Sequence, residues 1–314
     1  MRRGEVIHLP DWSAVRKVLL IRLRSIGDTV LMTPCLTALK AMRPEIKIAV
    51  VSEPLAAPVI EDHPLVDRLL IAEKSLGGRA RLIGQLRRAR YDVAFDLHGG
   101  TTATGLARFA GARWSVGYEG YRHSRWLDLR APDPDVILGR KRLHSVEQQL
   151  ALLHWAGVPW PVERPQLSLA VSSAAEDRVH EKLKTACVAQ AVSLRIPASM
   201  QSNRLSTKPV AQANSLRHIG HFAVIAPAAA FESKRWTAAG FAEVARHLRD
   251  CWQLPSVVIA GPGQEPLAES VAAQAGAVAL GGLTLKELIA LINGSRAFVG
   301  NDGGPMHIAA ALRR

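Results

Sequence analysis

Short runs of apolar, often β-branched residues alternate along the first half of the chain with longer stretches in which apolar residues recur at helical spacing. The pattern predicts strands at 18–21, 46–51, 68–71 and 92–95, and helices at 28–42, 56–60, 79–89 and 102–110. Strands that alternate with helices of this length favour right-handed βαβ units and a parallel sheet. After Val116 the alternation is lost in a Trp-, Arg- and Pro-rich stretch, 117–134, for which we expect irregular structure.

A Pro-rich segment separates two halves of the chain. A helix predicted at 145–156 ends before Gly157, and Pro159, Pro161 and Pro165 follow, which is typical of a hinge between domains. We therefore assign residues 1–165 to a first domain and 166–314 to a second.

The second half shows the same alternation, with one interruption. Residues 185–218 have no clean period, and we interpret them as a long, partly disordered insertion. Beyond them we predict strands at 222–226, 257–260 and 297–299, and helices at 239–250, 267–275 and 285–292.

The last residues, NDGGPMHIAAALRR, form a Gly-rich turn that opens onto a helix of about three turns. A doubly wound domain normally continues with a further strand and a covering helix, so we expect the second domain to be incomplete. Two α/β halves on either side of a hinge suggest a ligand cleft, since open α/β sheets bind ligands at the carboxyl ends of their strands. The loops expected to line it are 22–28, 96–101, 227–236, 261–265 and 300–304.

Composition limits the class of protein. Of the 314 residues 48% are hydrophobic and 21% are charged, which supplies enough apolar side chains for buried cores and excludes a wholly disordered or fibrous protein. Forty Lys and Arg against 27 Asp and Glu leave a net charge of +13, which favours anionic partners such as nucleic acid, lipid headgroups or phosphorylated substrates.

The spacing of the cysteines and the lack of a recognisable targeting segment indicate a reducing compartment. Cys35, Cys187 and Cys251 are far apart and lack CxxC spacing, which supports neither a disulfide framework nor a zinc site. The basic start of the chain lacks the apolar centre of a signal peptide, and no window offers 18 consecutive apolar residues. We expect a cytoplasmic protein, with contact to a membrane surface left open.

The first segment that can carry chemistry is IRLRSIGDTVLMTP, in which a strand turns into a helix. Gly27 permits close approach of the backbone, and the free amides of the helix start suit an anion. Asp28 is either the N-cap of that helix or a base directed into the cleft. The dinucleotide fingerprint GxGxxG is absent, which disfavours a nicotinamide oxidoreductase.

Two further segments carry groups suited to phosphate. In APAAAFESKRWT, Lys234 and Arg235 place two cations beside a turn, as a pyrophosphate clamp or as a solvated pair. In VGNDGGPMHIAA, Gly303 and Gly304 lead into a helix, where backbone amides can hold a phosphate or simply form a turn. His307 can donate to that phosphate, and Asp302 can hold the turn or a sugar.

In this order, the segments IRLRSIGDTVLMTP, KRW and NDGGPMHIAAAL resemble glycosyltransferase family 9, the ADP-heptose:lipopolysaccharide heptosyltransferases. The resemblance includes the segment DLHGG at 96–100 and extends over about four-fifths of the chain, outside 185–218. It implies an α/β fold of the GT-B type: two Rossmann-like, doubly wound domains facing across a cleft. The first domain then binds mainly the acceptor and the second binds the nucleotide sugar.

The resemblance also implies roles for individual residues. Asp28 matches the catalytic base, Gly27 the backbone facing the donor phosphates, and Lys234, beside Arg235, the phosphate-binding lysine. The donor-binding turn is matched by Asp302, Gly304 and His307, with Gly303 where Ser or Thr is usual. Glu265, in IAGPGQE, lies where the family places a carboxylate for the donor's ribose or base, and His98 and Gly99 lie on the acceptor side. Pro227-Ala228-Ala229 stands where PGA is usual.

The activity implied is an inverting transfer of heptose from ADP-heptose to a lipopolysaccharide inner-core acceptor, with neither metal nor cofactor and with no nucleic-acid partner. The acceptor places the protein at the inner face of the inner membrane, where the arginines of the first half would suit its phosphates and acidic sugars. We interpret Asp133-Pro-Asp135 as a turn rather than a metal-binding DxD motif. The alternatives are another nucleotide sugar or acceptor on the same scaffold, an epimerase of the same fold, or a truncated, non-catalytic anion-binding protein.

Overall fold

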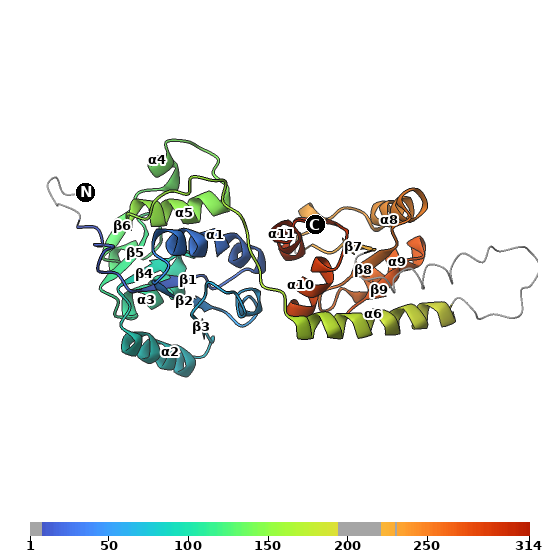
Figure 1. Cartoon of the computed structure of the whole chain (residues 1–314), viewed down its shortest axis with the longest axis horizontal. Helices are drawn as coiled ribbons and strands as arrows, with labels where there is room; N and C mark the ends of the chain where they lie inside the picture. The colour runs from blue at the N-terminus through green and yellow to red at the C-terminus, as the bar shows by residue number, and fades with distance from the viewer. Residues whose placement is uncertain (1–7, 194–220, 230) are drawn as a thin grey trace, which may run out of the picture. The chain divides into compact units, whose positions relative to one another are not determined.

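The computed structural model describes residues 8–193, 221–229 and 231–314. The chain divides into two compact units, Met1–Ala170 and Val171–Arg314. Figure 1 labels the helices and strands of each unit. The sequence-based boundary after residue 165 lies a few residues before this division.

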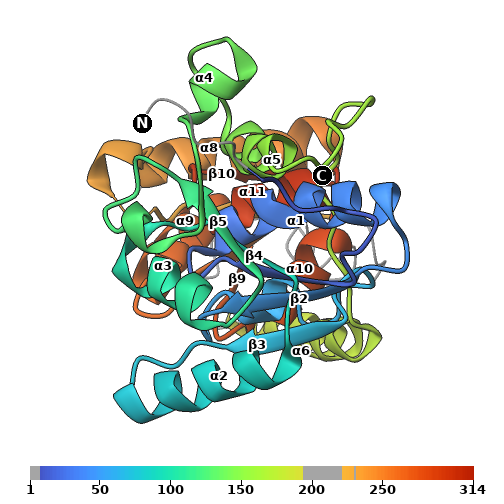
Figure 2. The ribbon, with the colours of Figure 1, turned by 90° about the vertical axis from the view of Figure 1, so that its left-hand side faces the viewer.

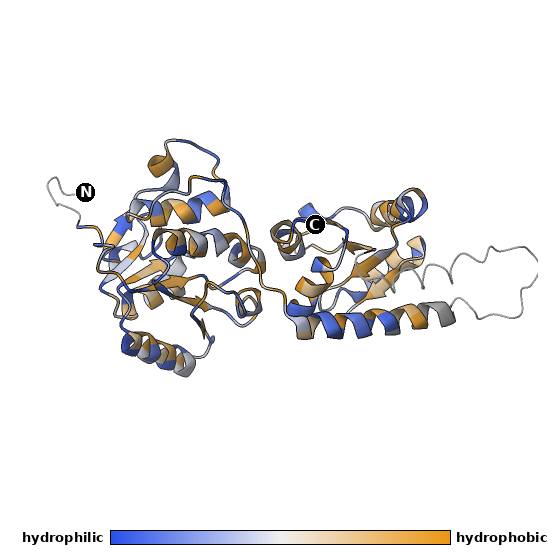
Figure 3. Cartoon of the chain, in the orientation of Figure 1, coloured by the Kyte–Doolittle hydropathy of each residue, from blue (hydrophilic) through white to orange (hydrophobic). Residues whose placement is uncertain are grey.

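The first unit contains a six-stranded sheet in which all paired strands are parallel and the order is β3-β2-β1-β4-β5-β6. Its strands are β1 (Lys17–Ile21), β2 (Lys47–Ser52), β3 (Arg68–Ile71), β4 (Val93–Asp96), β5 (Trp114–Tyr118) and β6 (Leu129–Ala131). The central strands β1 and β4 are almost fully buried, as expected for a parallel sheet covered on both faces. Figure 3 shows their strongly hydrophobic character. The strand order reverses between β1 and β4, so their carboxyl ends form the point where such folds bind ligands.

Helices cover both faces of this sheet. They are α1 (Ile26–Met42), α2 (Leu76–Ala89), α3 (Gly100–Phe109), α4 (Pro134–Leu138) and α5 (Ser145–Trp155), with 3-10 turns η1 (Ala57–Val59) and η2 (Ser124–Trp126). Figure 2 shows α1 and α5 on one face and α2 and α3 on the other. On the second face, Leu82 and Leu86 of α2 and Leu106 of α3 pack with Leu19 and Ile21 of β1 in one buried cluster.

The second unit contains a four-stranded parallel sheet of order β10-β7-β8-β9. Its strands are β7 (Ala223–Ala226), β8 (Ser256–Ile259), β9 (Val278–Leu280) and β10 (Ala297–Gly300). Its helices are α6 (Ser173–Ser193), α8 (Ala238–Trp252), α9 (Glu265–Ala275), α10 (Leu285–Asn293) and α11 (Gly304–Ala311), with the 3-10 turn η3 (Glu232–Lys234). Phe241 of α8 and Val271 of α9 pack against Ile225 and Val258 of the sheet. The strand order reverses between β7 and β10, which brings together the loops that follow them.

Two expectations about irregular segments are wrong. Residues 117–134 are not irregular throughout, because β5 extends to Tyr118 and Leu129–Ala131 forms β6 at the sheet edge. Three residues are too few for a periodic signal to be recognised. The expected insertion at 185–218 begins inside α6, where buried Val179, Leu183 and Cys187 continue a four-residue spacing. The remainder of that segment, 194–218, lies outside the described residues.

Candidate functional site

Asp28 lies in the first turn of α1, directly after the carboxyl end of β1. Ser25 is the N-cap of the helix, and Asp28 occupies the third helical position of a capping box. The Ser25 amide and hydroxyl both donate to Asp28 Oδ2, at 3.3 and 3.2 Å. The N-cap interpretation of Asp28 is therefore wrong in detail, because Ser25 holds that position and Asp28 caps from within the helix.

Arg22 pairs with this carboxylate. Its Nη2 lies 2.7 Å from Asp28 Oδ2, its side chain is only 12% exposed, and its Nη1 donates to the Leu97 carbonyl at the end of β4. Burial of Asp28 alone would raise the carboxyl pKa, but the Arg22 charge and the Ser25 hydrogen bonds outweigh it and lower that pKa. These hydrogen bonds and the ion pair all end on Oδ2. Among the described residues none occupies Oδ1, so this oxygen of an ionised carboxylate is open to a ligand.

The loop after β4 is built around Asp96. This fully buried carboxylate accepts hydrogen bonds from the backbone amides of His98 and Gly99, at 3.0 and 2.7 Å, and from the Thr104 hydroxyl at 2.7 Å. Burial raises the pKa of Asp96 even though these three donors oppose it. Asp96 therefore fixes the backbone from which the candidate residues His98 and Gly99 project.

Gly99 and His98 have different environments in this loop. Gly99 has a φ of +73°, and a Cβ there would lie 2.9 Å from the Tyr121 ring, so glycine lets that ring pack on the loop. Burial, followed by the charges of Arg22 and Arg24, lowers the pKa of His98. The imidazole is thus neutral at pH 7, and its Nδ1 is buried without a hydrogen-bond partner among the described residues.

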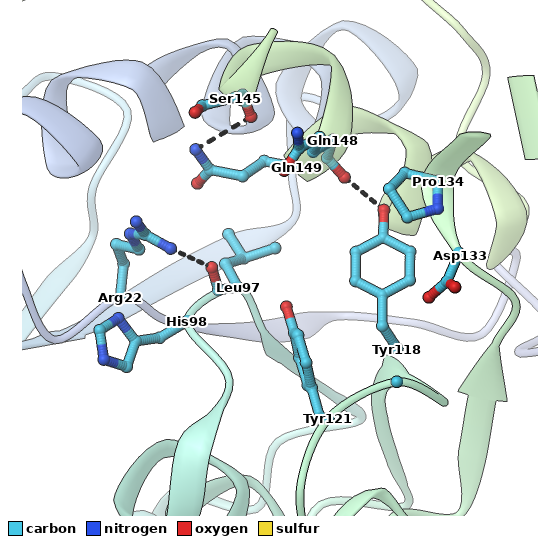
Figure 4. Close-up of a pocket in the computed structure, with 11 residues that line it drawn as sticks. Arg22, Leu97, His98, Tyr118, Tyr121, Asp133, Pro134, Ser145, Gln148 and Gln149 are labelled. Atoms are coloured by element: carbon cyan, nitrogen blue, oxygen red, sulfur yellow. Dashed lines mark hydrogen bonds between the residues drawn. The ribbon is translucent and has the colours of Figure 1, made fainter. Parts of the chain in front are cut away.

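A cavity of about 340 Å³ lies beside these groups in the first unit. Figure 4 shows Arg22 and His98 on one side and the tyrosines and Gln149 on the others. Its lining comes from the ends of β1, β4 and β5 and from the start of α5: Arg22, Leu97, His98, Tyr118, Gly120, Tyr121, Asp133, Pro134, Ser145, Gln148 and Gln149. Asp133 is the N-cap of α4, so the turn expected at Asp133-Pro-Asp135 is the start of a short helix.

A second cluster lies at the carboxyl ends of β7 and β10 in the second unit. Lys234 Nζ is 2.5 Å from Asp302 Oδ2, and His307 Nε2 is 3.9 Å from Asp302 Oδ1. The hydrogen bond from Lys234 is the main reason that the pKa of Asp302 is lowered. Asn301 fastens the two loops, since its Oδ1 accepts from the Trp236 amide at 3.1 Å and its Nδ2 donates to the Pro227 carbonyl at 2.7 Å.

Gly303 and Gly304 begin α11 next to this cluster. Gly303 is the N-cap of this helix, and Pro305 has no N–H to offer. The Met306 and His307 amides donate to the Gly303 carbonyl, at 3.1 and 3.3 Å. Of the amides at this helix start, those of Gly303 and Gly304 therefore remain for an anion. Lys234, Asp302 and His307 therefore share one location with the start of a helix, as their spacing suggested.

The other two candidates of the second unit contact different residues. Arg235 Nε donates to the Ala229 carbonyl at 3.4 Å, and its Nη1 lies 3.9 Å from Glu232 Oε1. Glu265 is the first residue of α9, where its Cγ faces Gly281 beyond β9. Neither side chain joins the Lys234–Asp302 pair among the contacts of the described residues.

Several residues of these sites were not selected from the sequence. Arg22, Asp96 and Asn301 each lie at or directly after the end of a strand, and that position was a usable signal. Tyr121 and Gln149 had no such signal, because 117–134 shows no period and Gln149 lies within a predicted helix.

The described residues contain neither a metal-binding cluster nor a helix that could span a membrane. No group of three or more His, Cys, Asp or Glu side chains in that part of the chain is placed to hold a metal ion. The helices described also include none that is long and apolar enough to cross a membrane.

Comparisons with known proteins agree with the geometry. A family model described as glycosyltransferase family 9 (heptosyltransferase) matches residues 79–314. The chain is 26% identical over 306 residues to lipopolysaccharide heptosyltransferase 3 of Escherichia coli, covering 91% of this chain and 78% of that relative.

Solved structures show the same fold. A glycosyltransferase family 9 protein of Veillonella parvula superposes with a TM-score of 0.72 at 19% identity, covering 95% of this chain and 78% of that one. The E. coli ADP-heptose lps heptosyltransferase II gives 0.70 at 24% identity, covering 95% and 82%. The expected α/β fold of the GT-B type is thus confirmed. The chain belongs to glycosyltransferase family 9 and is a glycosyltransferase.

Proposed function

We propose that this glycosyltransferase transfers heptose from ADP-heptose to a hydroxyl of a lipopolysaccharide inner-core acceptor, with inversion and without a metal ion. The observation that carries the proposal is the Asp28 carboxylate, in which Oδ2 is held by Ser25 and Arg22 while Oδ1 is open. The membership in family 9 and the heptosyltransferase relatives support the choice of sugar and acceptor.

Asp28 acts as the general base. Its lowered pKa keeps it ionised at neutral pH, so Oδ1 can take the proton of the acceptor hydroxyl as that oxygen attacks the anomeric carbon. The new glycosidic bond forms while the bond from the anomeric carbon to the diphosphate oxygen breaks, and ADP departs with the electron pair. A single displacement inverts the anomeric configuration and requires no second nucleophilic carboxylate.

The second unit stabilises the departing diphosphate. Negative charge grows on the ADP oxygens, and Lys234 supplies positive charge for it. His307 and the Gly303 and Gly304 amides at the start of α11 supply hydrogen-bond donors. Lys234 and Asp302 are both about half exposed, so exchanging Asp302 for a phosphate oxygen costs little. This positive cluster takes the place that a metal ion has in other transferases.

The remaining donor contacts are proposed from the resemblance to family 9. Glu265 begins α9 after β8 and is proposed to accept hydrogen bonds from the ribose or base of the donor. Arg235 and Gly303 are proposed to lie near the diphosphate, and Gly27 is proposed to let the donor phosphates approach the backbone of α1.

The acceptor is proposed to be presented at the inner face of the membrane. Arg81, Arg87, Arg88 and Arg90 lie on α2 or at its end, all four are exposed, and α2 contains no acidic residue. Each such cation near an anionic lipid surface contributes about 1 kcal/mol. Changing Arg81, Arg88 and Arg90 together to Gln should weaken binding to phosphatidylglycerol vesicles at least about tenfold. Equal binding by the variant and the unchanged chain would remove α2 from the membrane contact.

A donor panel tests the proposed reaction. The full chain is incubated with an inner-core acceptor lacking heptose and with ADP-heptose or UDP-sugars, in the presence of EDTA. We expect a product one heptose heavier, formed only with ADP-heptose, and an inverted anomeric centre by NMR. Turnover only with a UDP-sugar would overturn the donor, and turnover abolished by EDTA would overturn metal independence.

A further inference from the structure

The cavity of the first unit contains polar groups that the proposed mechanism does not use. Gln149, the fifth residue of α5, is buried, with only 6% of the residue exposed. Its Nε2 donates to the Ser145 carbonyl at 3.3 Å, while its Oε1 is buried without a partner among the described residues. An amide oxygen in that state loses its hydration and gains nothing in return, so it marks a place where a donor from a ligand is favourable.

Tyr121 provides a second group on the opposite wall. Its ring rests on Gly99 and meets the Tyr118 ring edge-on, with centroids 5.7 Å apart. The Tyr118 hydroxyl donates to the Gln148 carbonyl, whereas Figure 4 shows the Tyr121 hydroxyl reaching into the cavity without a hydrogen bond to the other lining residues. A tyrosine hydroxyl both donates and accepts, and none of the other residues drawn in Figure 4 uses either capacity.

Arg22 connects these groups to the base. Its guanidinium lines the same cavity, its Nε is buried without a partner among the described residues, and its Nη2 holds Asp28. Figure 4 shows the Gln149 amide, the Tyr121 hydroxyl and the Arg22 guanidinium around one open space. A molecule in this cavity therefore meets the same guanidinium that holds the Asp28 carboxylate.

We infer that Tyr121 and Gln149 bind the hydroxyl groups of an acceptor sugar ring in this cavity and so determine which acceptor is used. The inference rests on the proposed function, and it assigns the acceptor's recognition to two residues outside every motif that carried the family resemblance. Gln149 Oε1 needs a donor, Arg22 Nε needs an acceptor, and Tyr121 takes either, which one ring with several hydroxyls satisfies. An acyl chain would leave all three groups without partners.

Asp133 adds a further polar group at the edge of this cavity. The exposed carboxylate of Asp133 borders the cavity beside Gly120, where a Cβ would lie 3.0 Å from Asp133 Oδ1. Carboxylates and side-chain amides accept hydrogen bonds from hydroxyl groups, and together with an aromatic ring they suit a hydroxylated ligand. Gly120 leaves room for this carboxylate at the cavity rim.

Steady-state kinetics of the full chain test the inference with Tyr121→Phe and Gln149→Leu. Each variant removes one hydrogen-bonding group from the cavity while keeping its bulk, so we expect the acceptor KM to rise about tenfold. The KM for ADP-heptose and the Kd for ADP should stay within about twofold, because neither residue is assigned to the donor. Tyr91→Phe is the control, since Tyr91 is a buried tyrosine of the core cluster under α2, outside the cavity lining, and its change should alter neither constant.

An acceptor series sharpens the assignment. If Gln149 Oε1 accepts from one ring hydroxyl, the unchanged chain should bind an acceptor analogue without that hydroxyl more weakly than the acceptor itself. The Gln149→Leu variant should bind the analogue and the acceptor equally well, because the interaction is already lost. Folded variants whose acceptor KM equals that of the unchanged chain would overturn the inference, as would a rise in donor KM alone.

Measuring acceptor binding without donor separates a failure of this inference from a failure of the proposed function. Calorimetric titration of the inner-core oligosaccharide into the unchanged chain and both variants requires no turnover. Weaker binding to the variants supports the cavity even if another sugar is transferred. Equal binding to all three chains overturns the inference independently of the donor.

Discussion

The charge of Glu287 is predicted to hold helices α6 and α10 of the second unit together. It is buried at the third position of α10, where Oε2 accepts from the Thr284 amide at 2.8 Å. From α6, Lys182 Nζ lies 2.8 Å from the same oxygen, and Arg178 Nε lies 3.3 Å from Oε1. Replacing Glu287 by Gln removes the charge to which both cations are bound while preserving size.

The stability that Glu287 contributes can be estimated from the pKa of its carboxyl group. Burial opposes ionisation, but Lys182 and Thr284 outweigh it and lower the pKa of Glu287 from 4.5 to about 2. That difference corresponds to about 3 kcal/mol of stabilisation of the folded state. Because Lys182 is 37% and Arg178 is 52% exposed, solvent screens part of this energy, and we expect a loss of about 1–2 kcal/mol in Glu287→Gln.

Hydrogen exchange of the full chain provides the assay. At pH 7 the amides of α6 and α10 should exchange about five- to thirtyfold faster in Glu287→Gln. A lowered carboxyl pKa stabilises the fold above about 4.5, and this contribution is lost as the pH falls toward 2, so the difference should be less than half as large at pH 3. Glu269→Gln on the exposed face of α9 is the control. Equal exchange in both variants at pH 7, or a difference that persists unchanged at pH 3, would refute the reasoning.

Two further predictions concern the candidate sites. Lys234→Ala should weaken ADP binding about tenfold or more in calorimetry, because a charge-assisted contact to phosphate is lost, and an unchanged Kd would remove Lys234 from the donor site. Gly99→Ala should lower the free energy of unfolding by about 1–3 kcal/mol, since it combines a φ of +73° with a contact to Tyr121. Gly77→Ala, in open space on α2, should be neutral or slightly stabilising, and equal melting temperatures for these two variants would contradict this account.

The sequence predicted the sheet centres better than the sheet edges. Strands such as β1 and β4 are buried on both faces, so their apolar runs are long enough to recognise. β6 and β9 have three residues each and were missed, because so short a run carries no period. The interior strand β5 was also missed, since Trp114–Tyr118 runs into the stretch that was expected to be irregular. Helix α6 was also missed, because its second half falls in the segment from residue 185 onward, which shows no clear helical spacing.

Local motifs identified part of the site, and contacts between distant segments account for the rest. Asp28, Asp302 and His307 each sit at a strand-to-helix turn, a position that a sequence reveals through glycine and capping residues. The partner of Asp28 on its own loop, Arg22, was not selected, because nothing in the spacing shows that its side chain turns back to the helix start. Gln149 reaches the cavity through the packing of α5 against α1, α4 and β5, which the sequence does not show.

The central claim is that Asp28 is the base for transfer from ADP-heptose, and Asp28→Asn tests it most directly. Asparagine keeps the size of the side chain and its place in the first turn of α1 but cannot take the acceptor proton. Transfer to the inner-core acceptor and ADP affinity are measured on the same preparation. We predict that kcat falls about 10²- to 10⁴-fold while the Kd for ADP stays within about twofold. Unchanged kcat in a folded Asp28→Asn chain would contradict the account.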